Sequence, residues 1–585
     1  MSKQEEDGDA AFDRIMEMVG DAGPFQWRYN LIFNVVAVTF FAMNVVNILL
    51  ILTVPEHHCA VPGMELYNVS DQELWNNLTL PRAPTSRGDL GYSSCTMYNV
   101  SLYPPGTDPA QLVFGENDTI PCQYGYWYDR QYYDKIPATQ QNWVCEKELY
   151  ATNVFAVIRM AEVLGSFALG QLGDRIGRLP VFLVSIVMIL VGRSFAVMTD
   201  EIYWLFALLA FIGSFGTNTS FQSPLIVVME ISRDEDRAAL SLWQLVGWTL
   251  GVSLPPLAFW WLRDWVWFML LTSIPCALFI LIPGYTIESP RWLATQGLYK
   301  KCLTELKKIA KVNARQFLLT EDELRERVPV KEVEKTYGIA SLFSGWHMTK
   351  LSGLLLFSWI CNTIPTYTLL LFSMQMGGNP FLNVFWQGAI ELPAYFCGQM
   401  LCNSIGRRIT NCIAFMGIAL ACIPIILIIQ NSETEIYVTT LAVIVKFFVC
   451  LSYFALYLQS YEVYPITLRQ TGTSFGLIIS NIFGTLGPYI VYLGTNNDVR
   501  LPFAAMGLIG LVGCFASSCL PETLYQKLPE TMQEGRLFGK GQKFWSLPQK
   551  PRAEQPQQPA TNRDYSKLSQ HESVPESQSD SEIAA

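Results

Sequence analysis

Twelve apolar blocks, each about twenty residues long, constrain the fold of this chain more than any other feature of its sequence. A helix needs about 20 mostly apolar residues to cross the roughly 30 Å of hydrocarbon in a bilayer. The blocks cover approximately residues 31–54, 150–172, 179–198, 203–226, 240–262, 265–286, 351–374, 382–402, 409–430, 436–459, 471–493 and 502–520. Only 15% of all residues are charged, against about a quarter in soluble domains. The sequence therefore predicts an all-α membrane protein with twelve transmembrane helices.

The polar segment 55–149, between the first two blocks, has features of an oxidising and glycosylating compartment. Its Asn-x-Ser/Thr sequons are Asn68, Asn77, Asn99 and Asn117, and its cysteines are Cys59, Cys95, Cys122 and Cys145. Several sequons beside an even number of cysteines favour a glycosylated, disulfide-bonded loop outside the cell. The pairing of the cysteines stays open.

Lysine and arginine are concentrated in a second polar segment, 287–350, and in short loops on the same side of the membrane. The positive-inside tendency places that side in the cytosol. We therefore expect a multi-pass plasma-membrane protein with both termini cytosolic, including a polar N-terminal segment, 1–30, and a linker with helices at 287–350. The cytosolic tail, 521–585, lacks apolar periodicity from about residue 540, which predicts disorder there.

Three short motifs recur in both halves of the chain, in the same order and at nearly the same spacing. The motif GQLGDRIGR at 170–178 follows the second block, and NSIGRR at 403–408 follows the eighth. A glutamate with an arginine seven residues later follows blocks four and ten, and a further glutamate follows blocks six and twelve. Such repeats are typical of transporters that bind substrate between two related bundles near mid-membrane. The repeat predicts two pseudo-symmetric six-helix bundles, 31–286 and 351–520.

The charged residues of these motifs lie at cytosolic helix ends. Acids and arginines there can pair when an inner gate is closed and separate when it opens, or they can simply anchor the helix ends. We favour gating for Asp174, Arg175, Arg178, Glu230, Arg237, Arg407, Glu462 and Arg469.

Ionisable residues near the bilayer centre are functional candidates, because burying each one costs a few kcal/mol. Glu391, Lys446 and Asn481 each lie about ten residues into a predicted helix, which is a depth of roughly 15 Å. Aromatic faces bind amines by cation–π attraction worth up to about 2 kcal/mol, although any single tryptophan can instead serve packing. The predicted wall of the site is Glu391, Lys446, Asn481, Trp359, Tyr367, Trp243, Gln244 and Trp248.

Arg159 and Glu162 lie three residues apart on the second span, and therefore on one helix face. They can form an ion pair that fixes helix packing, or they can bind the two charges of a zwitterion. Arg193 lies near the outer end of the third span, where we expect its side chain to extend to the membrane interface.

The motif GQLGDRIGR resembles the loop signature of the major facilitator superfamily. The segments Glu288–Leu293 and Glu462–Arg469 are similar to the organic cation/anion/carnitine transporter family within it. So are the segment Phe25–Arg28 and the large cysteine-bearing first loop that ends in Trp143-Val-Cys-Glu-Lys. The resemblance covers roughly residues 12–540, and the stretch GGNPFLN leading into ELPAY looks closest to carnitine-type members.

The resemblance implies a major facilitator fold in which Glu391, Trp359, Tyr367 and Gln244 line the substrate cavity. It also implies a basic residue at the position of Lys446, which is present here. The position of Asn481 is typically Asp in cation carriers and Arg in anion or carnitine carriers. Its neutrality here leaves the charge of the substrate open.

We expect a transporter of small organic cations or zwitterions, such as amines or carnitine-like compounds, working by alternating access. An organic anion carrier is the alternative, favoured by Lys446 and Arg159 and opposed by Glu391. A non-transporting receptor or scaffold of the same fold is a second alternative. An enzyme is not expected, since the sequence has no Walker loop, metal-ligand cluster or nucleophile–base motif. The expected partners are a small organic substrate and the lipid bilayer, with no cofactor, metal or nucleic acid; co-transport of Na⁺ or H⁺ is left open.

Overall fold

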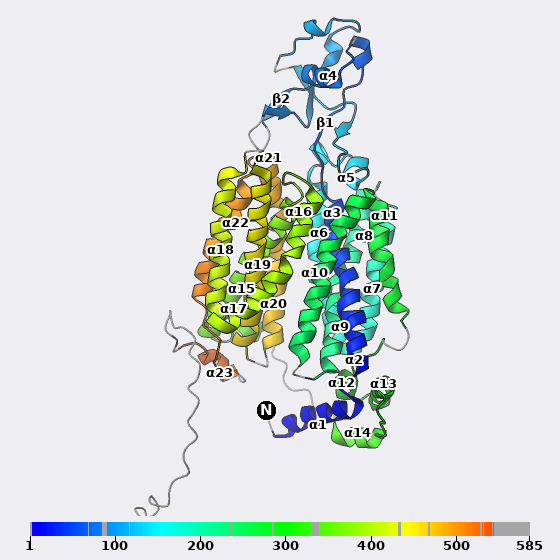
Figure 1. The fold of residues 1–585 in the computed structure, drawn as a ribbon, viewed down its shortest axis with the longest axis vertical. Helices are drawn as coiled ribbons and strands as arrows, with labels where there is room; N and C mark the ends of the chain where they lie inside the picture. Colours follow the sequence, from blue (N-terminus) through cyan, green and yellow to red (C-terminus); the bar gives the residue numbers. More distant parts are fainter. Residues whose placement is uncertain are drawn as a thin grey trace, which may run out of the picture.

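Two helical bundles stand side by side in the computed structural model, with a small domain at one end and short helices at the other (Figure 1). The structure describes residues 3–67, 69–84, 90–115, 118–199, 201–233, 236–282, 286–328, 339–430, 434–465, 468–526, 529, 532–540 and 542.

The first bundle contains the six N-terminal spans. Helix α2 (Pro24–Tyr29), a π-helical stretch (Asn30–Val36) and α3 (Ala37–Ile51) form one continuous helix. The others are α6 (Leu149–Ile176), α7 (Arg178–Ala196), α8 (Tyr203–Phe215) with α9 (Thr217–Glu230), α10 (Arg237–Leu262), and α11 (Trp265–Ser273) with the 3₁₀ stretch Ile274–Ile280.

The second bundle repeats this arrangement. Its helices are α15 (Trp346–Phe372), α16 (Pro380–Ala389) with α17 (Glu391–Ile405), α18 (Arg407–Ile428), α19 (Glu435–Val463), α20 (Arg469–Gly484) with α21 (Leu486–Asn496), and α22 (Leu501–Ser518). Each of the twelve predicted spans therefore has a helix at the expected place, which confirms the predicted fold class.

Length and composition allow ten helices of the described chain to cross a membrane. The apolar helix Trp265–Ile280 is shorter, and the eighth span is divided at Ile390 into α16 and α17. Interrupted helices leave backbone groups without helical partners, and transporters tolerate them where they border a binding site. The interruption at Ile390 makes Glu391 the first residue of α17.

The segment between α3 and α6 is a small domain with elements that the all-α expectation did not include. It holds three antiparallel strand pairs: β1 (His57–Cys59) with β6 (Tyr126–Tyr128), β2 (Arg82–Pro84) with β3 (Leu90–Tyr92), and β4 (Thr96–Tyr98) with β5 (Thr119–Pro121). Helices α4 (Gln72–Thr79) and α5 (Pro137–Gln140) complete it. Each strand is three residues long, too short to give a period-two pattern that distinguishes it from loop.

Short helices cover the opposite end of the molecule. They are α12 (Pro290–Thr295), α13 (Tyr299–Val312), α14 (Glu321–Arg327) and the N-terminal α1 (Lys3–Val19), with α23 (Met532–Leu537) below the second bundle. Helix α1 packs Phe12 and Ile15 into one apolar cluster with Leu306 of α13 and Leu324 of α14. The first bundle therefore rests on a folded platform.

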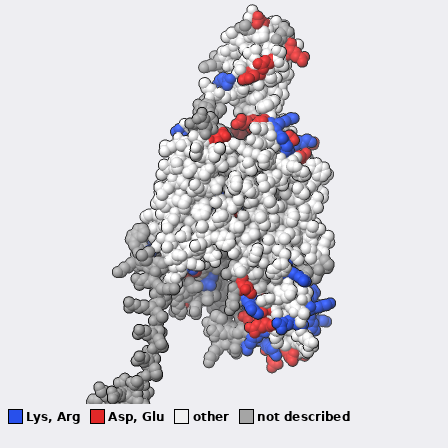
Figure 2. All heavy atoms as spheres, in the orientation of Figure 1, with Lys and Arg blue, Asp and Glu red and all other residues white. Residues whose placement is uncertain are grey.

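The surface separates charge from apolar groups. On the face in view, Figure 2 shows a wide, nearly uncharged belt across the bundles, with lysine and arginine, and acidic residues beside them, gathered at the end occupied by the short helices. Large apolar side chains are exposed within the helical region, including Trp261, Leu427 and Phe515. An apolar surface of this extent fits contact with lipid rather than water.

Candidate functional site

A buried ion pair occupies the interior of the second bundle. The Nζ atom of Lys446 on α19 lies 2.8 Å from Oε1 of Glu391 on α17, and the two side chains are 7% and 5% exposed. The other carboxylate oxygen, Oε2, is also buried and has no hydrogen-bond partner among the described residues. The pair is therefore balanced in charge, but it retains an unused acceptor.

Two tyrosines that the sequence analysis did not identify lie near this pair. Tyr395 is buried and Tyr453 is 37% exposed, and both lie within electrostatic reach of Glu391. Tyr395 follows Glu391 by four residues and Tyr453 follows Lys446 by seven, so helical periodicity places each on the face of its charged neighbour. That periodicity is the signal that could have identified them.

A second buried ion pair lies in the first bundle and faces its partner bundle. Nη2 of Arg159 is 2.7 Å from Oε1 of Glu162, and both side chains are buried. The guanidinium carbon of Arg159 lies 4.6 Å from the ring centroid of Tyr367 on α15. The Tyr367 hydroxyl donates a hydrogen bond of 3.3 Å to Oδ1 of Asn481. Arg159 thus contacts the second bundle, where Tyr367 links it to Asn481.

Arg193 does not reach the membrane interface, so the expectation that its side chain extends there is wrong. It is 1% exposed, and its Nη2 donates to the Asn44 carbonyl at 3.2 Å and to Ser214 Oγ at 3.0 Å. Ser214 lies eleven residues into α8, which is roughly 17 Å along the helix axis. The guanidinium therefore points into the bundle, because polar groups on α3 and α8 bind it there.

The predicted aromatic residues lie in different surroundings. Trp359 is buried, donates to Ser460 Oγ at 3.0 Å and packs edge-on against Tyr453, with ring centroids 5.4 Å apart. Gln244 donates to the Phe221 carbonyl at 2.9 Å.

The other two predicted tryptophans, Trp248 and Trp243, do not share one environment either. Trp248 stacks edge-on against Phe221, with centroids 5.2 Å apart. Trp243 is 53% exposed and makes no ring contact with another described residue. Trp359 therefore contacts Tyr453, which lies within electrostatic reach of Glu391, whereas Gln244 and Trp248 share a contact with Phe221.

The repeated motifs form matching structures at the platform end of the bundles. Both oxygens of Glu288 accept backbone N–H groups of Arg178 and Leu179, at 2.9 and 3.1 Å, at the start of α7. Glu522 does the same for Arg407 and Arg408 at the start of α18, at 2.8 and 3.1 Å. A carboxylate is favoured at a helix N-terminus because free N–H groups and the helix dipole meet there.

Glycine is required beside both caps. Gly177 and Gly406 have φ angles of 111° and 97°, and a Cβ at either position would overlap the capping carboxylate.

The arginines of the two motifs form ion pairs with acids at different positions. Arg178 pairs with Asp174 at 2.8 Å, and the aspartate is 73% exposed. Arg407 has no aspartate at the matching position, which is Asn403, and pairs instead with Glu462 at 2.9 Å. Each pair lies within one bundle.

The other predicted gating residues are placed as follows. Glu230 accepts from Ser289 Oγ, and Glu462 likewise from Thr523 Oγ1. Arg175 is exposed and Arg469 is half-buried, and neither pairs with a described acid. Arg237 begins α10, but its side chain lies outside the described residues.

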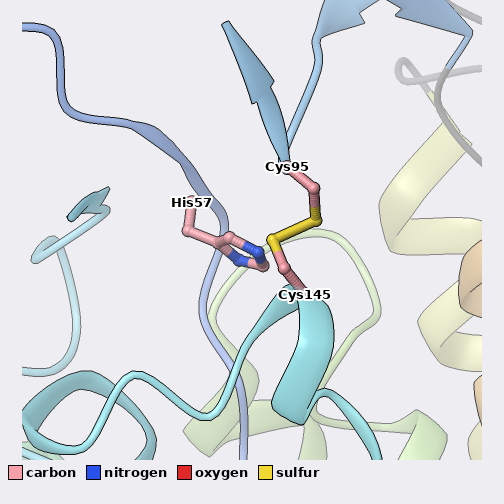
Figure 3. Close-up of side chains that lie close together, drawn as sticks. All are labelled: His57, Cys95 and Cys145. Carbon is pink, nitrogen blue, oxygen red and sulfur yellow. A yellow bond between two sulfur atoms is a disulfide. The ribbon is translucent and has the colours of Figure 1, made fainter. Parts of the chain in front are cut away.

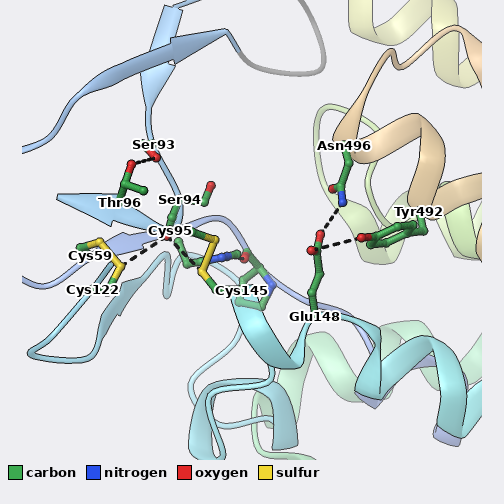
Figure 4. Close-up of a disulfide and its surroundings, with 12 residues drawn as sticks. Cys59, Ser93, Ser94, Cys95, Thr96, Cys122, Cys145, Glu148, Tyr492 and Asn496 are labelled. Carbon is green, nitrogen blue, oxygen red and sulfur yellow. Dashed lines mark hydrogen bonds between the residues drawn. A yellow bond between two sulfur atoms is a disulfide. The ribbon is translucent and has the colours of Figure 1, made fainter. Parts of the chain in front are cut away.

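The opposite ends of the two bundles are joined. Glu148, just before α6, accepts hydrogen bonds from Asn496 at 2.6 Å and from Tyr492 at 3.3 Å, both on α21 (Figure 4). Phe381 of α16 packs its ring within 5.3 Å of Tyr133 and 5.5 Å of Phe259. Apolar residues of both bundles form one buried cluster at this end.

Disulfides link Cys59 to Cys122 and Cys95 to Cys145 in the small domain. Asn77 is exposed and Asn99 half-buried, whereas Asn68 and Asn117 lie outside the described residues.

The His57 ring lies against the Cys95–Cys145 disulfide (Figure 3). These three residues come close enough to suggest a metal site, but two sulfurs that are bonded to each other cannot act as thiolate ligands. Burial lowers the pKa of His57.

Comparisons with known proteins agree with this architecture. The sequence profile of the family described as "Sugar (and other) transporter" matches residues 120–534. Solute carrier family 22 member 7 of Sus scrofa is 29% identical over 538 residues, covering 90% of this chain and 96% of the relative. The beta-alanine transporter of Drosophila melanogaster is 27% identical over 559 residues, covering 90% and 89%. The inward open conformation of the xylose transporter XylE from E. coli superposes with a TM-score of 0.51 at 15% identity, covering 70% of this chain and 91% of that chain.

Proposed function

Because the chain belongs to the sugar (and other) transporter family, with the major facilitator fold, it is a multi-pass membrane transporter, and we propose that it carries small zwitterionic or cationic organic solutes by alternating access. One observation carries the choice of substrate. Each bundle contributes a buried ion pair, Arg159–Glu162 and Lys446–Glu391. The positive charges of Arg159 and Lys446 both act on Tyr367, which is therefore within electrostatic reach of both pairs.

Pairs of this kind suit a substrate with charged ends. Ionisable groups at mid-membrane are rare, and they commonly mark substrate or ion pathways. An incoming ammonium group competes with Lys446 for Glu391, whose Oε2 has no hydrogen-bond partner among the described residues. Until then Lys446 neutralises Glu391, so this carboxylate is not a lone buried charge, which would cost several kcal/mol.

Alternating access requires that the outer and the inner end of the space between the two bundles close one after the other. The ends that carry Glu148 and Phe381 are packed together, whereas Arg178 and Arg407 pair within their own bundles at the platform end. We assign this arrangement to a state closed toward the outside. In the opposite state, the arginines and acids of the platform end are free to pair across the bundles.

We place the protein in the plasma membrane with both termini cytosolic. The concentration of lysine and arginine at the platform end supports this orientation, and so do the disulfides and sequons of the small domain. A relative named beta-alanine transporter supports an amino-acid-like substrate. The proposal does not include coupling to Na⁺ or H⁺; the assay below tests it by varying both ions.

An organic anion is the second candidate, and the burial of Arg193 favours it. Among the described residues no carboxylate lies within ion-pair distance of that guanidinium, so the interior of the bundles has an excess of positive charge.

A competition screen distinguishes these candidates. Cells that express the chain are given labelled amines, ω-amino acids and dicarboxylates, with and without Na⁺ and at two external pH values. The proposal predicts saturable uptake of amino-bearing compounds that dicarboxylates do not inhibit. Uptake of dicarboxylates alone would replace it with the anion function, and no uptake above mock-transfected cells for any class would contradict both.

A further inference from the structure

The described interior of the two bundles holds an unequal number of buried charges. Three cations, Arg159, Arg193 and Lys446, lie there with two acids, Glu162 and Glu391. Lys446 is paired with Glu391 and Arg159 with Glu162, which leaves Arg193 as the cation in excess. A buried charge without a counter-ion is costly, so this excess needs an explanation.

Arg193 is bound in place but not neutralised. Its Nη2 donates to a backbone carbonyl and to a hydroxyl, both uncharged, while Nε and Nη1 are buried and have no hydrogen-bond partner among the described residues. No carboxylate lies within 4.0 Å of it in the part of the chain that the structure describes. Nε of Arg159 is likewise buried, and no described residue accepts a hydrogen bond from it.

Glu162 lies within electrostatic reach of both arginines. It is bonded to Arg159. Gly165, one helical turn after Glu162, packs against the Phe215 carbonyl, next to the Ser214 hydroxyl that binds Arg193. The charge of Glu162 also acts on Arg193. Arg159 faces the second bundle through Tyr367, whereas Arg193 is enclosed by α3 and α8. Both arginines are therefore near one carboxylate, and of the two it is Arg159 that reaches the partner bundle through a contact among the described residues.

We infer that Arg193 is an alternative counter-ion for Glu162, which releases Arg159 to bind a carboxylate group of the substrate. When that carboxylate binds, Glu162 and the substrate carboxylate face Arg159 and Arg193, so these four groups balance, while the ammonium end of the substrate lies with Glu391 and Lys446 in the second bundle. The inference rests on the proposed function, because it names the second charged end of the same substrate. It requires a carboxylate on every good substrate, so a simple amine that lacks one adds positive charge to a site already in excess.

Uptake of a matched pair of probes tests the specificity. β-Alanine and β-alaninamide share the ammonium group and differ in the carboxylate. Wild-type protein should take up the acid at least about tenfold faster, equivalent to about 1.4 kcal/mol. Arg193→Gln should bring the ratio close to one, because Glu162 then holds Arg159, and Arg193→Lys should restore most of it.

A wild-type ratio near one, or an unchanged ratio in Arg193→Gln at equal surface expression, would overturn the inference. Uptake of neither probe would count against the proposed substrate class, and a second measurement then decides the inference. That measurement is the coupling between Glu162→Gln and Arg193→Gln in thermal unfolding, taken with and without Arg159→Gln. The coupling should at least about double when Arg159 is absent, because Glu162 then relies on Arg193. Equal coupling in both backgrounds would refute counter-ion exchange.

Discussion

Replacing Glu391 with glutamine should leave Lys446 as an unpaired cation in the interior of the second bundle. The ammonium is 2.8 Å from the carboxylate, and both side chains are almost completely buried. Removing one member of such a pair costs about 3–5 kcal/mol, because the remaining charge has neither water nor a counter-ion. We expect Lys446→Met to cost a similar amount, since Glu391 is then the unpaired charge.

The double variant should behave differently. With both charges removed, nothing in that site needs a counter-ion, and replacing a buried pair by apolar or neutral groups is often close to neutral. We expect Glu391→Gln with Lys446→Met to lie within about 1 kcal/mol of wild type. The coupling free energy between the two sites is then at least about 3 kcal/mol.

Denaturant unfolding of the four proteins in detergent micelles measures this cycle. Glu305 and Lys308 on α13 provide a matched control, with a similar separation of 2.9 Å but a lysine side chain that is 44% exposed. Glu305→Gln should cost less than about 1 kcal/mol. The two interior substitutions could instead be additive, so that the double variant loses as much unfolding free energy as the two single variants together. That result would show that Glu391 and Lys446 do not stabilise each other.

Three further outcomes follow from the outer half of the molecule. Replacing Asn68, Asn77, Asn99 and Asn117 together should abolish the mass loss on glycosidase treatment, and a persisting loss would contradict the orientation. In Glu148→Gln, a cysteine placed at position 489 in place of Tyr489 should react with an impermeant maleimide about tenfold faster. The reason is that a hydrogen bond to a charged acceptor is stronger than one to a neutral acceptor by about 1.4 kcal/mol. An unchanged labelling rate would show that Glu148 does not help to hold the outer ends together. The lowered pKa of His57 means that the unfolded chain binds a proton first, below about pH 6.5. Stability should therefore fall between pH 7 and pH 5.5, and His57→Gln should reduce that fall in thermal unfolding; an equal fall in both proteins would exclude this histidine.

The twelve spans could be predicted because the hydrocarbon thickness fixes how many apolar residues a crossing helix needs. The interruption at Ile390 also has a signal in the sequence, which we did not use: Gly388 lies two residues before it, and Pro393 has no N–H to donate to the Ala389 carbonyl four residues earlier. The short strands of the outer domain and the choice of disulfide partners depend on chain topology, which local spacing does not determine.

The candidate site was predictable to a similar degree. Depth along a helix identified Glu391 and Lys446, because an ionisable residue in an apolar block is visible in the sequence. Depth could not say where the long Arg193 side chain points. The carbonyl of Asn44 and the hydroxyl of Ser214 lie deeper in the bundle and bind it there. Likewise, the capping of Arg178 by Glu288 joins residues 110 positions apart, a contact that no local pattern shows.

The central claim is that Glu391 recognises the positive end of a transported solute. Its most direct test is uptake of labelled β-alanine and labelled succinate, side by side, by wild type and Glu391→Gln, per molecule at the cell surface. Glutamine keeps the shape and hydrogen bonding of the side chain but removes its charge. The account predicts that β-alanine uptake falls at least about tenfold, while succinate uptake is unchanged or increased. Normal β-alanine uptake by the glutamine variant would contradict the account and favour an organic anion as the substrate.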